Sequence, residues 1–253
     1  MLTGFYNWLI GNMGTPGDYA YQSIHIWSTV VVMAILGLVI FLGLRYSTNE
    51  IARRRLLLVV AWFHLAFEVL WRLIYFFIKG AALKELWPMY PCNLGSVLLP
   101  ILAIWNIRRG KQLFYLFGFV GSVLTMAIPD GIFSTNVLVF PVLKSILQHT
   151  GLLMIPVLEL IYGTYRPTLK DMGWVIGGCV VHLINCEGID RLLGFTGDYM
   201  FLRSGMPFVI PGVPTWITLP VFALLVFTVL SYLCDIKGSR QLLKQLKKQK
   251  NHA

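Results

Sequence analysis

Seven apolar stretches, each close to the length of a membrane-spanning helix, constrain this sequence more than any other feature. A helix needs roughly 20 largely apolar residues to cross the hydrocarbon layer of a bilayer. The stretches cover about residues 24–44, 56–78, 89–107, 112–128, 143–162, 172–190 and 215–234. The chain is only 13% charged, about half the charged fraction of a soluble domain. We therefore expect an all-α, polytopic membrane helix bundle of about seven transmembrane helices.

The basic residues between these stretches indicate how the bundle is oriented. Lys and Arg accumulate in the cytoplasmic segments of membrane proteins. With the N-terminus outside, the inner segments hold 15 basic residues and the outer segments hold 5. We therefore predict a multi-pass protein of the cell membrane with an extracellular N-terminus and a cytoplasmic C-terminus. Topology then accounts for the net charge of +10, and we expect no nucleic acid as a partner.

The sequence predicts a single transmembrane domain, residues 1–236, followed by a basic cytoplasmic tail, residues 237–253. The tail places leucines among lysines, which is typical of a helix lying on an anionic membrane surface. Three irregular segments are assigned to the outside, residues 1–23, 129–142 and 191–214. Their glycines, prolines and aromatic residues, all on one side, favour a working face outside the membrane.

His64, Glu68 and Arg72 are ionisable residues inside the second apolar stretch. Their spacing of four residues puts them on one face of a helix. Because charges are costly in a bilayer, this face is expected to point into the bundle. Either the carboxylate and the guanidinium form a structural ion pair, or the face binds a lipid headgroup or orients a catalytic histidine.

The third stretch begins with Tyr-Pro-Cys-Asn, residues 90–93. The proline suits the first turn of a helix, and there the helix dipole would favour a thiolate at Cys92. Asn93 adds a side-chain amide, and His149 of the fifth stretch lies at a comparable depth. A thiol and an imidazole at matching depth are the minimum for a nucleophile and its base. Cys92 and His149 are therefore the candidate catalytic residues, with simple packing as the alternative for Cys92.

Two other groups of polar residues have competing interpretations. His182 and Cys186 share a helical face beside Asn185, as a second dyad or as two metal ligands, but one helix supplies no complete coordination shell. We favour hydrogen bonds between helices, or a pocket wall, for His182 and Asn185. His25 either caps a neighbouring helix or contacts a headgroup. No metal and no cofactor is expected, because the sequence has no P-loop, dinucleotide fingerprint or zinc-protease motif.

Three short motifs occur in the order of a known family: Tyr-Pro-Cys-Asn-Leu-Gly at 90–95, Gln-His at 148–149 and Asp-Tyr-Met-Phe-Leu-Arg at 198–203. Over nearly its whole length the chain resembles the bacterial YwaF-like integral membrane proteins, which are related to animal transmembrane protein 164. The resemblance implies a lipid acyltransferase in which a cysteine accepts an acyl chain and a histidine acts as base. Carried over by position, Cys92 is the nucleophile and His149 is the base.

The resemblance also implies membrane phospholipids and lysophospholipids as substrates. It assigns the third motif to the outer pocket wall, with Tyr199 and Arg203 as candidate substrate contacts. Arg72 or Arg203 is then expected on the lipid phosphate and the Asn93 amide on the oxyanion. The chain departs from the family at two positions. Asn93 stands where the animal proteins have a histidine, and Gly95 stands where many bacterial members place the cysteine of a Leu-His-Leu-Cys version.

Other functions fit parts of the same pattern. With water as the acceptor, the same Cys–His pair would hydrolyse lipids. A non-catalytic protein would use the polar residues to bind or transport a lipid or a small solute. A seven-helix sensor matches the helix count and the orientation, but the expected inner loops are short and the tail carries no signalling domain.

Overall fold

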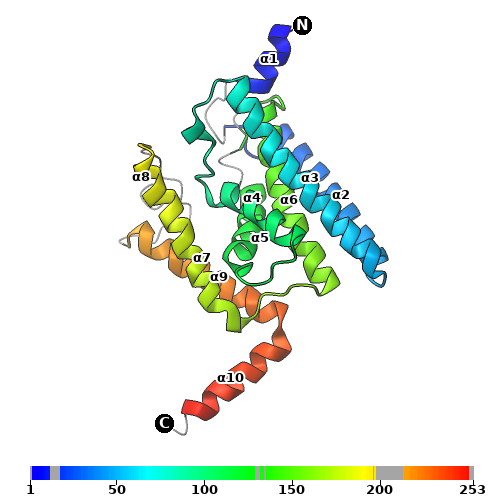
Figure 1. Ribbon diagram of the computed structural model, residues 1–253, viewed down its shortest axis with the longest axis vertical. Helices are drawn as coiled ribbons and strands as arrows, with labels where there is room; N and C mark the ends of the chain where they lie inside the picture. The colour runs from blue at the N-terminus through cyan, green and yellow to red at the C-terminus, as the bar shows by residue number, and fades with distance from the viewer. Residues whose placement is uncertain are drawn as a thin grey trace.

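The computed structural model describes residues 2–11, 18–128, 132–133, 135–195, 197 and 213–250. Within these ranges every regular element is a helix. The first helices of the chain pack around a central one, the later helices lie to one side, and the C-terminal helix projects away from the others (Figure 1). The expected all-α fold is therefore confirmed.

Two long apolar helices form one side of the bundle (Figure 1). α2 (Ser23–Arg45) is followed by a short turn and then by α3 (Glu50–Phe77). The side chain of Asn49 accepts a hydrogen bond of 3.0 Å from the backbone N–H of Ala52, which caps the first turn of α3. α3 begins earlier than the expected residue 56, because the helix includes the arginines that the sequence analysis had assigned to an inner loop.

α6 (Phe140–Tyr162) is the central helix of the bundle. In its apolar window 72% of the residues are buried, compared with 22% in α2 and 28% in α3. The reason is that α6 packs against α2, α3, α4 and α5. It ends at Gly163, whose left-handed conformation (φ 64°) suits glycine. A polar residue on α6 is therefore surrounded by protein rather than by lipid.

α3 and α6 meet at Gly151, beside the imidazole of His64. A Cβ atom at position 151 would lie 1.9 Å from His64 Nδ1, and His64 is buried. Gly151→Ala is therefore expected to lower the free energy of unfolding by about 1–3 kcal/mol through overpacking. Thermal unfolding in detergent measures this, with Gly121→Ala as control, since a Cβ at Gly121 meets nothing within 4 Å. A Tm for Gly151→Ala equal to that of the wild type would contradict this packing.

α4 (Pro91–Ile104) and α5 (Gln112–Ala127) are shorter helices that pack on α6. A proline occupies the first position of α4, as the sequence predicted. The guanidinium of Arg54 donates to the carbonyl oxygens of Ala103 at 2.9 Å and Ile104 at 2.6 Å. These bonds satisfy carbonyl groups that the end of a helix leaves free. α4 is thus shorter at both ends than the expected stretch 89–107.

The sixth stretch is helical along its whole length but changes its winding. A single turn, η2 (Leu169–Asp171), leads into α7 (Met172–Leu183), which continues as a π-helix, η3 (Ile184–Ile189), and ends in α8 (Asp190–Leu192). A Cβ at Gly178 of α7 would lie 2.6 Å from a backbone oxygen of α5. Glycine is therefore required for this close contact between α5 and α7.

The last two helices meet at a sharp bend. α9 (Thr215–Cys234) and α10 (Ile236–Lys250) are bent by 109° relative to each other. Asp235 lies at the bend, and its side chain accepts a hydrogen bond of 3.1 Å from the backbone N–H of Gly238. α10 contains the basic residues assigned to the tail and extends away from the bundle (Figure 1). Two short helices, α1 (Leu2–Ile10) and η1 (Leu83–Leu86), complete the described elements.

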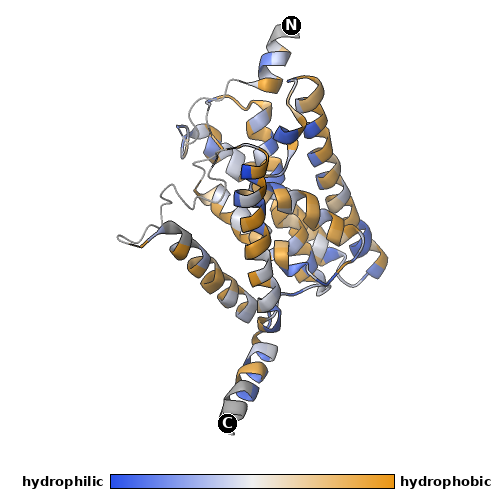
Figure 2. Cartoon of the chain, turned by 60° about the vertical axis from the view of Figure 1, so that its left-hand side comes forward, coloured by the Kyte–Doolittle hydropathy of each residue, from blue (hydrophilic) through white to orange (hydrophobic). Residues whose placement is uncertain are grey.

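Helix length and polarity fit a membrane protein. In the described part of the chain, four helical runs are long and apolar enough to cross a bilayer, namely α2, α3, α6 and the run Leu169–Leu192. The bent pair of α9 and α10 would make a fifth, and α4 and α5 are apolar but shorter. Large apolar side chains lie on the exposed faces of the long helices, and Figure 2 shows that hydrophobic residues make up most of these helices.

Candidate active site

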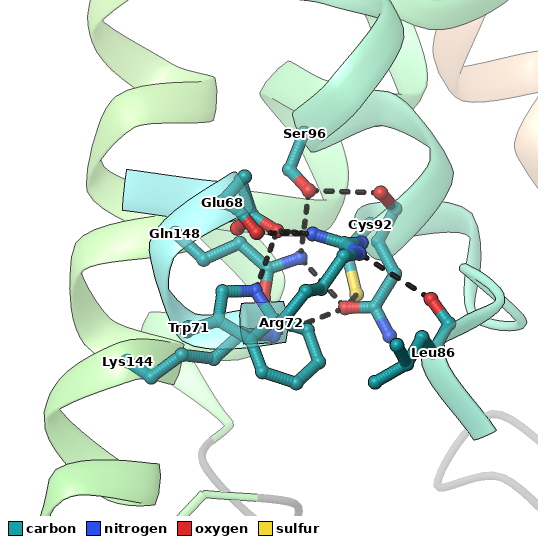
Figure 3. Close-up of polar contacts among 9 residues, drawn as sticks. Glu68, Trp71, Arg72, Leu86, Cys92, Ser96, Lys144 and Gln148 are labelled. Atoms are coloured by element: carbon teal, nitrogen blue, oxygen red, sulfur yellow. Dashed lines mark hydrogen bonds and ion pairs between the residues drawn. The ribbon is translucent and has the colours of Figure 1, made fainter. Parts of the chain in front are cut away.

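A cluster of polar side chains lies inside the bundle where three helices meet (Figure 3). The late part of α3 approaches the first turns of α4 and α6 there. We call the following residues the polar cluster: Glu68, Trp71 and Arg72 of α3, Cys92, Asn93 and Ser96 of α4, and Lys144 and Gln148 of α6. It contains one of the two predicted catalytic residues and several residues that the sequence analysis did not select.

Glu68 and Arg72 form the ion pair that their spacing favours. Glu68 is completely buried, and its Oε2 accepts hydrogen bonds from Arg72 Nη1 at 2.6 Å and from Trp71 Nε1 at 2.8 Å. Arg72 also donates to two backbone carbonyl oxygens, those of Glu68 at 2.7 Å and Leu86 at 3.3 Å. These hydrogen bonds offset the cost of removing the two charges from water.

Lys144 adds a second cation beside this pair. Its ammonium lies 4.2 Å from the centroid of the Trp71 ring, and the Arg72 guanidinium lies 4.8 Å from the same centroid. Lys144 donates to the side-chain oxygens of Gln148 and of Asn93, the latter at 3.4 Å. The sequence analysis counted Lys144 as a charge of the outer segments and missed this position. The signal that would have found it is the spacing of four residues between Lys144 and Gln148 of the Gln-His motif.

Cys92 lies in the first turn of α4 and is half-buried. Its Sγ is 4.0 Å from Asn93 Oδ1, a long thiol hydrogen bond. The same Asn93 oxygen accepts a hydrogen bond from the Lys144 ammonium at 3.4 Å. The thiol of Cys186, in contrast, donates to the backbone oxygen of Met89 at 2.9 Å. Cys92 is therefore the thiol that shares its surroundings with charged and amide groups.

His149 is buried on α6, next in sequence to Gln148. Its Nδ1 lies 2.7 Å from the carbonyl oxygen of Ser145, and a carbonyl can only accept, so Nδ1 carries the hydrogen. The second nitrogen, Nε2, is then the basic one. The hydrogen bonds of the described residues do not join His149 to Cys92. Whether the two side chains act together stays a prediction.

The segment that leads into α4 is held by the π-helix η3. Asn185 Nδ2 donates to the carbonyl oxygens of Pro88 at 2.7 Å and Met89 at 3.0 Å, and its Oδ1 accepts from Trp87 Nε1 at 2.8 Å. Asn185 was expected to bond to another helix, but its partners lie in the non-helical segment between η1 and α4. It fixes the backbone just before Cys92, and π-helical turns of this kind are frequent at functional sites.

Two other histidines that the sequence analysis selected lie elsewhere. His25 accepts a hydrogen bond from the backbone N–H of Tyr21 at 2.9 Å, and its Nε2 faces the backbone oxygen of Met126 at 3.1 Å. It therefore caps the end of α5, the first of its two predicted roles. His182 packs against the aromatic rings of Phe114 and Phe117. It contacts α5, whereas Cys186 contacts the segment before α4, so the two do not form a dyad.

Two predicted substrate contacts, Tyr199 and Arg203, lie outside the described residues. His64, which the sequence analysis placed on one helical face with Glu68 and Arg72, is buried on α3, one turn before Glu68. Within the described ranges its Nε2 has no hydrogen-bond partner. No three His, Cys, Asp or Glu side chains of the described residues form a group able to hold a metal ion.

A second group of charged residues lies away from the polar cluster, where the start of α5 meets the end of α6. Lys111 and Glu159 form a buried ion pair of 2.6 Å, and the Tyr165 ring lies 5.4 Å from the ammonium. Burial raises the pKa of Tyr165, so its hydroxyl stays neutral beside Lys111. A pocket of about 320 Å³ opens here, and its lining includes three arginines but no thiol and no imidazole.

Apolar helices of membrane-spanning length around a buried ionic cluster, with a thiol at a helix start, define the class of this protein as an all-α membrane protein. A family model described as the TMEM164 family matches residues 20–232, which include the whole polar cluster. The chain belongs to the TMEM164 family, and the relationship expected from the sequence motifs is confirmed. No curated protein and no solved structure gives a match to this chain.

Proposed function

We propose that this protein is an integral membrane acyltransferase that moves a fatty acyl chain between phospholipids through a thioester on Cys92. The observation that carries the proposal is the position of this thiol. Cys92 is the only one of the four cysteines in the polar cluster, where its thiol lies 4.0 Å from Asn93 Oδ1 and that oxygen also accepts from the Lys144 ammonium. His149, with Nδ1 committed to Ser145, keeps Nε2 as the base.

In the first half of the reaction, Cys92 takes the acyl group from a phospholipid. His149 removes the thiol proton, and the sulfur attacks the ester carbonyl carbon of the lipid. The side-chain amide of Asn93 and the free N–H groups of the first turn of α4 stabilise the negative oxygen of the tetrahedral intermediate. The bond between the carbonyl carbon and the glycerol oxygen then breaks. His149 returns the proton to that oxygen, and a lysophospholipid leaves.

In the second half, a hydroxyl group of a different lysophospholipid attacks the thioester carbonyl. His149 takes the hydroxyl proton, the new ester forms, and the carbon–sulfur bond breaks. The thiolate of Cys92 recovers the proton from His149. Arg72 binds the lipid phosphate, because its Nη2 has no hydrogen-bond partner among the described residues. Arg203 of the outer motif is the other candidate for this contact.

The proposed topology places this reaction in the outer leaflet of the cell membrane. We propose seven spans, with α4 and α5 as short spans inside the bundle, an extracellular N-terminus and a cytoplasmic C-terminus. The excess of basic residues on one side supports this orientation. The start of α4 then faces outward, and a phospholipid enters sideways between helices.

The proposal is tested by the intact mass of the purified protein after incubation with mixed phospholipids. We expect one added acyl chain that hydroxylamine removes and that maps to the peptide containing Cys92. A folded protein that binds lipid but acquires no adduct would contradict the proposal and favour a binding or transport function. Added lysophospholipid separates transfer from hydrolysis, because a transferase yields a new diacyl lipid and a hydrolase yields free fatty acid.

A further inference from the structure

We infer that Lys144 and Gln148 are positioning residues that fix the direction of the Asn93 side-chain amide, so that its NH₂ group is left to bind the carbonyl oxygen of the substrate. The inference rests on the proposed function and assigns roles to two residues that the reaction itself does not use. It follows from which groups in the polar cluster can donate hydrogen bonds and which can accept them (Figure 3).

Lys144 fixes the orientation of the Gln148 side-chain amide. A lysine ammonium has only donors, so the Gln148 atom that it contacts must be the carbonyl oxygen Oε1. Gln148 is almost completely buried, with 1% of its surface exposed. Its amide therefore cannot reverse and use water instead. The Nε2 group of Gln148 is consequently directed at α4.

The orientation of the Gln148 amide in turn fixes the orientation of the Asn93 amide. Gln148 Nε2 donates to Asn93 Oδ1 at 2.7 Å and to Ser96 Oγ at 3.2 Å. Ser96 uses its own hydroxyl hydrogen on the backbone oxygen of Asn93 at 2.8 Å. Only one arrangement of hydrogen-bond donors and acceptors satisfies Gln148, Asn93 and Ser96 together. In this arrangement Oδ1 of Asn93 faces Nε2 of Gln148.

The reverse orientation of Asn93 would place its NH₂ group against other donors. Oδ1 lies 3.4 Å from the Lys144 ammonium and 4.0 Å from the Cys92 thiol, as well as next to Gln148 Nε2. The reversed NH₂ group would face the Lys144 ammonium and the buried Gln148 NH₂ group, and donors set against each other without an acceptor are costly. Among the hydrogen bonds of the described residues none engages Nδ2 in the observed orientation, so this part of the chain leaves the NH₂ group available to a ligand.

A fixed donor beside the thiol has a specific use in acyl transfer. When Cys92 attacks an ester, the carbonyl oxygen becomes negatively charged close to the sulfur. Donors that are already oriented toward this charge stabilise the transition state more than the ground state. An asparagine free to rotate would present its oxygen part of the time and repel the charge. Lys144 and Gln148 therefore act on the reaction through Asn93 and not by contact with the substrate.

Gln148→Glu tests the inference, because glutamate has the same shape but only accepts. The introduced carboxylate still pairs with Lys144, and Asn93 reverses to donate its NH₂ group to that carboxylate, leaving Oδ1 toward the substrate. We expect kcat for acyl transfer to fall about 10²–10³-fold, as when one oxyanion donor is removed, with little change in KM. In an Asn93→Ala background the same substitution is expected to have no further effect. An equal fall in both backgrounds would overturn the inference.

A measurement without acyl chemistry follows the amide directly. In protein labelled with [¹⁵N]asparagine, the Asn93 side-chain signal is identified by its loss in Asn93→Asp. We expect its NH₂ hydrogens to exchange freely with deuterium in the wild type and to be protected in Gln148→Glu. Lys144→Met gives the second variant, in which Gln148 can reverse and the Asn93 exchange becomes intermediate. Unchanged exchange in both variants would overturn the inference.

The two experiments keep the inference separate from the proposed function. If wild-type protein forms no adduct at Cys92, the acyltransferase proposal fails, and deuterium exchange still decides the direction of the amide. If the adduct forms and Gln148→Glu forms it at the wild-type rate, the inference fails alone.

Discussion

Cys92→Ala is expected to abolish acyl transfer, with a loss of about 10³-fold or more, because removal of a covalent nucleophile leaves only binding and oxyanion stabilisation. The rate is measured as transfer of a labelled acyl chain to lysophospholipid in liposomes. The adduct in the intact mass should disappear in parallel. Cys92→Ser keeps a hydroxyl group of similar size and should retain only a small part of the rate.

Cys179→Ala is the matched control for this prediction. Cys179 is also half-buried and, like Cys92, packs against the apolar core, but it lies on α7, outside the polar cluster. The control removes a thiol without touching the polar cluster and should transfer acyl chains at the wild-type rate. Full activity in Cys92→Ala would exclude a thioester on this residue. The polar cluster would then be a binding site only.

Loss of Glu159 is expected to give the largest fall in stability. Lys111 and Glu159 are 1% and 2% exposed and form an ion pair of 2.6 Å. Removing one partner of a buried pair leaves an uncompensated charge and costs about 3–5 kcal/mol. Arg54 and Arg108 also act on this carboxylate, so Glu159→Gln leaves several cations together. It should therefore lower the Tm in detergent more than Lys111→Met does.

A double variant distinguishes the loss of charge balance from the loss of packing. Lys111→Met combined with Glu159→Leu removes both charges and keeps apolar volume, and such replacements are often neutral or stabilising. We expect its Tm to be higher than that of either single variant. Double and single variants with equal losses would show that the pair contributes through shape rather than charge.

Much of the fold could be predicted from the sequence because hydropathy acts locally along a chain. The apolar stretches marked the main helices, and the proline before Cys92 marked the start of α4. The spacing of Glu68 and Arg72 predicted their ion pair, because helical residues four apart share a face. The number of membrane spans was harder to predict from the sequence. α4 ends where Arg54 binds its carbonyl groups, and this contact joins residues distant in sequence.

The candidate site was predicted only in part, because its composition depends on how the helices are arranged. Lys144 follows directly on a segment that reads as a loop, and its place beside Trp71 arises only when α3 and α6 pack together. Asn185 was expected to bond between helices, but its partners before α4 required the three-dimensional fold. Contact between Cys92 and His149 remains a prediction from matching depth and family resemblance.

In the proposed topology, the short length of α4 sets the depth of the Cys92 thiol in the bilayer. Its 14 residues span about 21 Å, whereas the hydrocarbon layer is about 30 Å thick. Arg54 holds the carboxyl end of the helix, and in the proposed topology this end is cytoplasmic, so we expect Cys92 several ångströms beneath the outer surface. A phospholipid ester must sink to this depth, or the bilayer must thin around the protein. Membrane thickness thereby becomes a determinant of how often a substrate reaches the nucleophile.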